Sequence, residues 1–257
     1  MIANNVKRKL AAGDTVFGPM ILDLTGPGLP AMMRNAGADF VMYDMEAGCL
    51  GLPDVKMQAA LCRGLGVAPM VNTASDAFTD LTQPLDAGAL GLMVPLVESA
   101  AQAHKVVEAT RYPPAGRRGV AFGIAHDDYQ IGDMAAKANE VNHRTLVVAK
   151  IETAAGVAVS DDILAVDGID VAFIGHMDLS VSLGIPGGFD QPRFSEAVKQ
   201  VATACREHGK ALGCLVGSPI AARRWMDRGA RFIIYSTDVA LITGALSSAL
   251  AGLRVPA

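Results

Sequence analysis

The chain alternates short apolar runs with longer, helix-length segments eight times. The runs are rich in Val, Ile, Met and Phe and lack polar alternation, as in parallel strands that are buried on both faces. The eight runs lie at residues 15–23, 39–46, 68–73, 91–97, 145–152, 170–178, 211–216 and 231–237. Eight strand–helix units in 257 residues predict one α/β domain, a (β/α)₈ TIM barrel spanning residues 1–257.

The positions of glycine residues support this assignment of strands and helices. Glycines end several of the helical segments directly before the next apolar run, as expected of helix C-caps; they are Gly37, Gly66, Gly88, Gly209 and Gly229. A doubly wound open sheet is the alternative architecture, but no GxGxxG motif follows the first run. Residues 111–144 do not follow the alternation of apolar runs and helix-length segments. We interpret them as a long loop insertion between the fourth and fifth strands, and long ordered loops of this kind are often functional.

The composition of the chain limits which partners and which cellular compartment are expected. The net charge is −4 and no Lys/Arg run occurs, so nucleic acid is not expected as a partner. No apolar segment approaches the roughly 20 residues of a membrane-spanning helix, so no membrane association is expected. The four cysteines are scattered without a CxxC pair, which indicates reduced thiols in a soluble, cytoplasmic protein.

Polar side chains gather where the predicted strands end. In a barrel of this kind the active site is built at the carboxyl ends of the strands. Glu152 and Asp178 each close an apolar run on neighbouring strands, so the two carboxylates could share one divalent cation, with water and substrate oxygens completing its coordination. The alternative is that each acid caps the helix that follows it. Asp44 and Glu46 end the second run in the same way.

Three other features are candidates for the site. Backbone N–H groups between Gly175 and Leu179, near Met177 and Asp178, could face an anion where strand gives way to helix. Arg118 in the "PPAGRRGVAFG" segment could be aimed at an anion or could brace its loop. His126 has acidic neighbours and could titrate near neutrality.

Several motifs together resemble the HpcH/HpaI aldolase (citrate lyase-like) family. These proteins are metal-dependent, class II pyruvate aldolases, of which 4-hydroxy-2-oxoheptanedioate aldolases are typical. The stretch that begins "KIETAAGV" and runs on to "VAFIGHMDLSVSLGIPG" is similar to the family's metal-site signature. The segments "LDAGALGLMVPLVESAAQA", "ATRYPPAGRRGVA" and "GCLVGSPIAARRWMDRGARFIIYSTDVALI" are similar to the same family, and the resemblance runs from about residue 5 to the end.

The resemblance implies a fold, a reaction and a set of roles. The fold would be a barrel of the phosphoenolpyruvate/pyruvate-binding type, commonly a homo-oligomer (trimer or hexamer) whose last helix is exchanged between subunits. The reaction would be the reversible cleavage of a 4-hydroxy-2-oxoacid to pyruvate, or a related 2-oxoacid, and an aldehyde through a metal-stabilised enolate. Glu152 and Asp178 would bind the cation (Mg²⁺, Mn²⁺ or Co²⁺), and the backbone at Met177 and Asp178 would hold the substrate carboxylate. Asp86 would match an acid that serves the site from a neighbouring subunit or loop. Gly175, Asn72, Leu215 and Arg118 complete the predicted substrate-binding set.

The chain departs from the family pattern at three positions. Ala47 stands where the family has a His that takes part in proton transfer, and Asn72 stands where it has an Arg that contacts the oxoacid. Lys150 replaces a Gln found in many members. Because general-base assistance is worth about 10²- to 10⁴-fold, proton transfer should be altered.

The groups that could replace the missing base are His126, Lys150, Asp44 and Asp86. Lys150 could act as a base, hydrogen-bond a ligand or form a Schiff base. Two other functions stay open on the same site: an oxaloacetate-type decarboxylase or citrate-lyase-like lyase, and a non-catalytic binder of metal and oxoacid.

Overall fold

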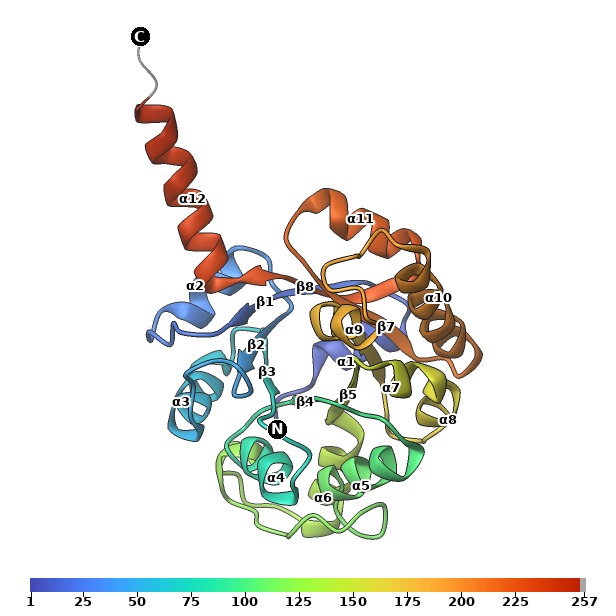
Figure 1. Cartoon of the computed structure of the whole chain (residues 1–257). Helices are drawn as coiled ribbons and strands as arrows, with labels where there is room; N and C mark the ends of the chain where they lie inside the picture. Colours follow the sequence, from blue (N-terminus) through green and yellow to red (C-terminus); the bar gives the residue numbers. More distant parts are fainter. Residues whose placement is uncertain (255–257) are drawn as a thin grey trace.

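The strands of the computed structural model, which describes residues 1–254, form one closed parallel barrel in sequence order (Figure 1). They are β1 (Val16–Ile21), β2 (Phe40–Asp44), β3 (Ala68–Asn72), β4 (Gly91–Val94), β5 (Leu146–Ile151), β6 (Val171–Ile174), β7 (Ala211–Val216) and β8 (Ala230–Thr237). Pairing of β1 with β8 closes the barrel. The predicted TIM barrel and all eight strands are therefore confirmed, and the open-sheet alternative is wrong.

Helices surround the strands. They are α1 (Asn5–Ala11), α2 (Leu29–Asn35), α3 (Leu52–Cys62), α4 (Phe78–Asp86), α5 (Ala100–Thr110), α6 (Met134–Arg144), α7 (Ala154–Ala158), α8 (Ser160–Leu164), α9 (His176–Ser182), α10 (Pro192–Glu207), α11 (Pro219–Asp227) and α12 (Asp238–Leu253), with a 3₁₀ turn at Ala125–Asp127. The five glycines predicted to end helices all have positive φ, between 66° and 113°. None of the helices in residues 1–254 has the length and apolar character that crossing a membrane requires.

The barrel interior is packed with side chains up to the level of the candidate site. Phe40 and Phe232 stack with ring centroids 4.5 Å apart, and Phe173 meets Phe232 edge-on at 6.4 Å. Glycines make room for these rings: a Cβ at Gly18 would lie 2.2 Å from the Phe40 carbonyl oxygen, and one at Gly213 would lie 2.9 Å from the Phe173 ring. Val6 and Leu10 of α1 join the same apolar cluster and cover its amino end.

Residues 111–144 follow α5 and belong to the amino-terminal end of the barrel. His126 shares a small cavity with Val67, Pro69 and Leu90, which lie at the starts of β3 and β4. The segment contains a 3₁₀ turn and α6 as well as loop. The helix that precedes the segment, α5, returns the chain to the amino-terminal end of the barrel, so the segment begins there. The sequence pattern did not indicate at which end of the barrel the segment would lie.

The last helix leaves the barrel. In Figure 1, α12 projects away from β8 instead of folding back over β8 and β1. Of its residues only Asp238 is buried, while Ile242, Leu246, Leu250 and Leu253 are exposed. Asp238 holds the start of the helix in place by accepting hydrogen bonds from three N–H groups, those of Leu22, Asp23 and Leu24, at 2.8–3.1 Å.

Candidate active site

The period-two alternation of the strands brings a polar layer to the carboxyl end of the barrel interior. Phe40 and Met42 of β2 belong to the interior cluster, so Asp44, two residues further, faces the same way. Asp44 lies opposite Asn72 in the β2–β3 register. On β5, Leu146 and Val148 are interior residues, and Lys150 continues their face. Asp44, Asn72 and Lys150 are all buried.

Hydrogen bonds join these side chains to Glu46. Asn72 donates through Nδ2 to Asp44 Oδ1 at 2.9 Å and to Glu46 Oε2 at 2.8 Å. Asp44 Oδ1 also accepts from the backbone N–H groups of Glu46 and Ala47 at 2.8 and 3.3 Å. Lys150 Nζ donates to Glu46 Oε2. The network therefore links β2, β3 and β5 through one carboxylate, that of Glu46, which with Asp44 ends the second predicted run.

Glu152 is the buried carboxylate beside this network. Its Oε1 accepts a hydrogen bond of 2.8 Å from the N–H of Leu96, a residue with φ of 52°. Its Oε2 lies 3.2 Å from Lys150 Nζ as an ion pair, yet it accepts no hydrogen bond from the described residues. Leu96 was not predicted as part of the site, and no sequence signal marks its backbone N–H as a partner of Glu152.

Burial and charge act in opposite directions on Glu152 and Lys150. Burial raises the pKa of Glu152, and the Lys150 charge and the Leu96 N–H offset only part of that rise. Burial alone would lower the pKa of Lys150, but the Glu152 charge and the hydrogen bond to Glu46 outweigh it, so the pKa is raised. Among the protein's own groups, Lys150 is therefore a charged hydrogen-bond donor.

Glu152 and Gly175 pack so closely that any side chain at position 175 would displace the Glu152 side chain. Ile151 pairs with Ile174 in the β5–β6 register, so Glu152 and Gly175 follow at the same edge of the sheet. A Cβ at Gly175 would lie 2.4 Å from Glu152 Oε2. Asp178 is exposed in the first turn of α9, three residues beyond Gly175. A buried carboxylate oxygen that accepts no hydrogen bond, with only the Lys150 ammonium near it, fits a hard divalent cation, to which Asp178 of the following helix could add a second carboxylate.

The number of protein ligands also fits such a cation. No group of three or more His, Cys, Asp and Glu side chains within residues 1–254 is arranged to hold a metal. Two carboxylates leave the remaining positions to water and substrate oxygens, as Mg²⁺ prefers. The residues are thus consistent with a substrate-completed metal site.

Replacing Gly175 with Ala should displace the Glu152 carboxylate while the fold persists. The φ of Gly175 is −76°, which alanine also adopts, so the substitution acts through its Cβ alone. We expect Mn²⁺ affinity to fall at least about tenfold, in line with the effect of disturbing groups that orient metal ligands. Titration of Mn²⁺ followed by electron paramagnetic resonance measures this, and Gly217→Ala, where an added Cβ meets nothing within 4 Å, is the matched control. Equal Mn²⁺ affinity in Gly175→Ala and the wild type would contradict the assignment.

The other predicted site residues fall into two groups. Met177 is exposed on α9 beside Asp178, and Leu215 lies near the end of β7, where it packs against the interior cluster. Asp86, Arg118 and His126 lie together elsewhere: Arg118 Nη2 donates to Asp86 Oδ1 at 2.5 Å, and Arg118 stacks over the Tyr112 ring at 4.8 Å. Tyr112 is in turn hydrogen-bonded to His126 at 2.9 Å.

His126 does not titrate near neutrality. Burial, followed by the charge of Arg118, lowers its pKa to about 4, so the imidazole is neutral at pH 7. The sequence shows acidic neighbours, which suggested titration near neutrality, but Tyr112 and Phe122 pack against the His126 ring and bury it. Within one chain, the Asp86–Arg118–His126 group lies at the amino-terminal end of the barrel and the Glu152 site at the carboxyl end.

Comparison with known proteins agrees with this geometry. A family model described as HpcH/HpaI aldolase/citrate lyase matches residues 22–245. The chain is 34% identical over 253 residues to a hydroxypyruvate/pyruvate aldolase of Roseovarius nubinhibens, covering 98% of this chain and 97% of that one. It is 34% identical over 251 residues to a 2-keto-3-deoxy-L-rhamnonate aldolase of Klebsiella pneumoniae, covering 98% and 93%.

A solved structure shares the whole architecture. The crystal structure of an HpcH/HpaI aldolase from Desulfitobacterium hafniense superposes with a TM-score of 0.93 at 29% identity and covers 97% of both chains. The family is a metal-dependent class, which supports a divalent cation in general terms. The barrel, the polar layer and these matches lead to one conclusion: the chain belongs to the HpcH/HpaI aldolase/citrate lyase family and is an aldolase, a carbon–carbon lyase.

Proposed function

We propose that the protein reversibly cleaves a 4-hydroxy-2-oxoacid to pyruvate, or a related 2-oxoacid, and an aldehyde, with a divalent cation. The observation that carries the proposal is Glu152 Oε2, a buried carboxylate oxygen that accepts no hydrogen bond from the described residues, lies 3.2 Å from Lys150 Nζ, and packs against Gly175, three residues before Asp178. The two aldolase-named relatives, each 34% identical, support an oxoacid substrate.

Glu152 and Asp178 would hold the cation, for which Mg²⁺, Mn²⁺ and Co²⁺ are the candidates. When bound, it would supply Lewis-acid stabilisation of the negative charge that develops on the oxoacid. The first-turn N–H groups of α9 at Met177 and Asp178 have no carbonyl partner inside the helix, so they are available to the substrate carboxylate. Gly175 keeps this turn close to Glu152, while Leu215 and Asn72 border the substrate.

Because Ala47 follows Glu46 where the family has a histidine, no imidazole at that position can take part in proton transfer. Asp44 accepts three hydrogen bonds through Oδ1, so its part in the proposal is to orient Asn72 and the Ala47 backbone. Lys150, charged and bound to Glu46, would donate a hydrogen bond to the 4-hydroxyl oxygen, which becomes the aldehyde carbonyl when the C3–C4 bond breaks, and the hydroxyl proton would pass to solvent water. Asp86 and Arg118 lie at the other end of the barrel in this chain, so they would serve the site only of a neighbouring subunit. His126 shares their cluster, and the proposal gives it no step.

Oxaloacetate decarboxylation is the second candidate, and the methyl side chain of Ala47 favours it. That reaction needs the cation and an enolate but no base at an aldol hydroxyl, so loss of an imidazole is tolerated. The same reasoning extends to a citrate-lyase-like cleavage. A non-catalytic binder would take up pyruvate or oxalate with the cation and turn over neither kind of substrate.

Measuring pyruvate release from 4-hydroxy-2-oxoacids and from oxaloacetate separates these functions. We expect cleavage of the 4-hydroxy-2-oxoacid that depends on added Mg²⁺, Mn²⁺ or Co²⁺ and stops with a chelator. Faster turnover of oxaloacetate alone would select the decarboxylase. Pyruvate binding by calorimetry without turnover of either substrate would select the binder, and cleavage that ignores the chelator would contradict the metal site.

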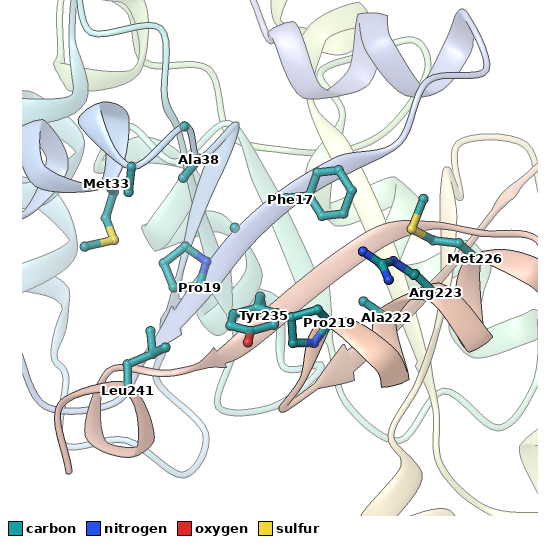
Figure 2. A pocket seen from close by; sticks show the side chains of 13 residues that line it. Phe17, Pro19, Met33, Ala38, Pro219, Ala222, Arg223, Met226, Tyr235 and Leu241 are labelled. Carbon is teal, nitrogen blue, oxygen red and sulfur yellow. The ribbon is translucent and has the colours of Figure 1, made fainter. Parts of the chain in front are cut away.

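We infer that the protein is a homo-oligomer, a trimer or hexamer, in which a second copy's α12 covers an open apolar groove. The groove has a volume of about 500 Å³ and lies between α2 and α11 on the outside of β1 and β8. Figure 2 shows Phe17, Pro19, Tyr235 and Met226 around it, with Leu241 at the base of α12. A helix after β8 would normally cover this gap, and α12 carries exposed apolar residues that match its apolar lining.

Charging the apolar face of α12 should dissociate the assembly. We expect the double variant Leu246→Glu/Leu250→Glu to elute as a monomer, because each buried leucine contributes about 2 kcal/mol to the association. Size-exclusion chromatography with light scattering measures the mass, and Ser247→Glu/Ser248→Glu on the same exposed helix is the control. An unchanged mass in the leucine variant would contradict a role of α12 in the interface.

The free thiols, of which Cys62, Cys205 and Cys214 are buried, support the cytoplasm as the compartment.

A further inference from the structure

A second polar cavity lies at the amino-terminal end of the barrel, away from the Glu152 site. It has a volume of about 180 Å³ and opens between α1 and the segments that enter β5, β6, β7 and β8. Its lining includes Lys7, Asp170, His208, Lys210 and Arg231, over an apolar floor that contains Leu10 and Leu146.

The one carboxylate among these lining residues is already occupied. Lys7 Nζ lies 3.0 Å from Asp170 Oδ1 and donates to Oδ2 at 3.1 Å. Asp170 Oδ2 also accepts the backbone N–H of Val147 at 2.9 Å. His208 is turned to Asp161, with Nε2 2.8 Å from Oδ1. Asp170 and Lys7 therefore compensate each other.

The remaining cations of the cavity have no carboxylate partner among residues 1–254. Neither Lys210 nor Arg231 forms an ion pair with a described residue, and the hydrogen bond of the Arg231 guanidinium goes to the carbonyl of Leu10 at 2.7 Å. Behind them, the buried Arg111 donates to three neutral oxygens, those of Thr110, Thr145 and Gly168. Burial, with the charges of Arg111 and Lys210, lowers the pKa of Lys7 in spite of Asp170.

An excess of positive charge over a small cavity is the electrostatic counterpart of a small anion. Among the lining residues, Lys7, Lys210 and Arg231 carry three positive charges against the single negative charge of Asp170. Guanidinium and ammonium donors form their strongest hydrogen bonds with phosphate and carboxylate oxygens. We propose that this cavity binds a small dianion, a phosphate group or a dicarboxylate, between Lys210 and Arg231.

Calorimetric titration of the Mg²⁺-loaded, full-length protein with inorganic phosphate and with succinate tests the proposal. Both titrations are carried out at constant ionic strength, because salt screens exposed cations. Saturating pyruvate is present in both, so that the proposed oxoacid site is already occupied. We expect saturable binding of one or both dianions, and the stronger of the two identifies the class. Lys210→Gln should weaken it at least about tenfold, the equivalent of one charge-assisted hydrogen bond.

The controls address charge and position. Lys210→Arg should retain binding, and Lys105→Gln, which removes an equally charged but exposed side chain on α5, should leave it unchanged. No saturable binding of either dianion, binding abolished by pyruvate, or equal affinity in Lys210→Gln would each overturn the proposal.

Discussion

Changing Glu152 to Gln is expected to lower kcat/KM for 4-hydroxy-2-oxoacid cleavage by at least about 10³-fold. The substitution keeps the size of the side chain and an oxygen that can still accept the Leu96 N–H. It removes the negative charge that lies against Gly175 and 3.2 Å from Lys150. Metal-ion catalysis contributes several kcal/mol, and about 4 kcal/mol corresponds to a thousandfold change in rate.

Mn²⁺ binding distinguishes loss of the cation from loss of the fold. The Glu152→Gln variant should bind Mn²⁺ too weakly to saturate, while its circular dichroism spectrum stays that of the wild type. Glu108→Gln, an exposed carboxylate on α5, should leave both activity and Mn²⁺ affinity unchanged. Full Mn²⁺ affinity in Glu152→Gln would refute the assignment of this residue as a metal ligand.

Restoring the family's polar groups should raise ordinary aldolase activity about 10²-fold or more. The change needs three substitutions, Ala47→His, Asn72→Arg and Lys150→Gln. Ala47 is exposed at the end of β2, so an imidazole can be added without displacing core atoms. An arginine at position 72 alone would meet the Lys150 ammonium, because both side chains face Glu46. Removing the lysine charge relieves that repulsion, and general-base assistance is worth about 10²- to 10⁴-fold.

The informative measurement is kcat for aldol cleavage beside kcat for oxaloacetate. If Ala47 marks a lost base, the triple variant gains on the 4-hydroxy-2-oxoacid and changes little on oxaloacetate. The single variants Ala47→His and Asn72→Arg show whether the two groups act together. An aldol rate that stays at the wild-type level in the triple variant would mean that the site is built for another reaction.

The polar layer shows what could be predicted and what could not. Asp44, Glu46, Asn72, Lys150 and Glu152 all follow apolar runs, so their arrival at one end of a parallel barrel follows from the sequence pattern. The hydrogen bonds among them do not. Which oxygens of Asp44 and Glu152 accept hydrogen bonds depends on the strand register and on the backbone of Leu96, which no local pattern encodes.

Residues 111–144 do not contribute side chains to the Glu152 site of their own chain, and the reason is physical. Length and composition marked the segment as an insertion, but α5 carries the chain back to the amino-terminal end before it begins. His126 and Arg118 therefore pack around Tyr112, and burial holds the pKa of His126 far below neutrality. A charged or titratable residue in a loop acquires its function from what surrounds it, and that is a property of the tertiary structure.

The sequence by itself determined the number and order of the strands, the helix ends and the strand ends that carry polar groups. These follow from local hydrophobic periodicity and from glycine's access to positive φ, which need no distant contacts. Only the tertiary structure decided that Glu46 links Asn72 to Lys150, that Gly175 leaves space for Glu152, and that α12 projects from the barrel. Each of these depends on atoms far apart in the chain meeting at van der Waals or hydrogen-bond distance, and closure of the barrel sets those distances.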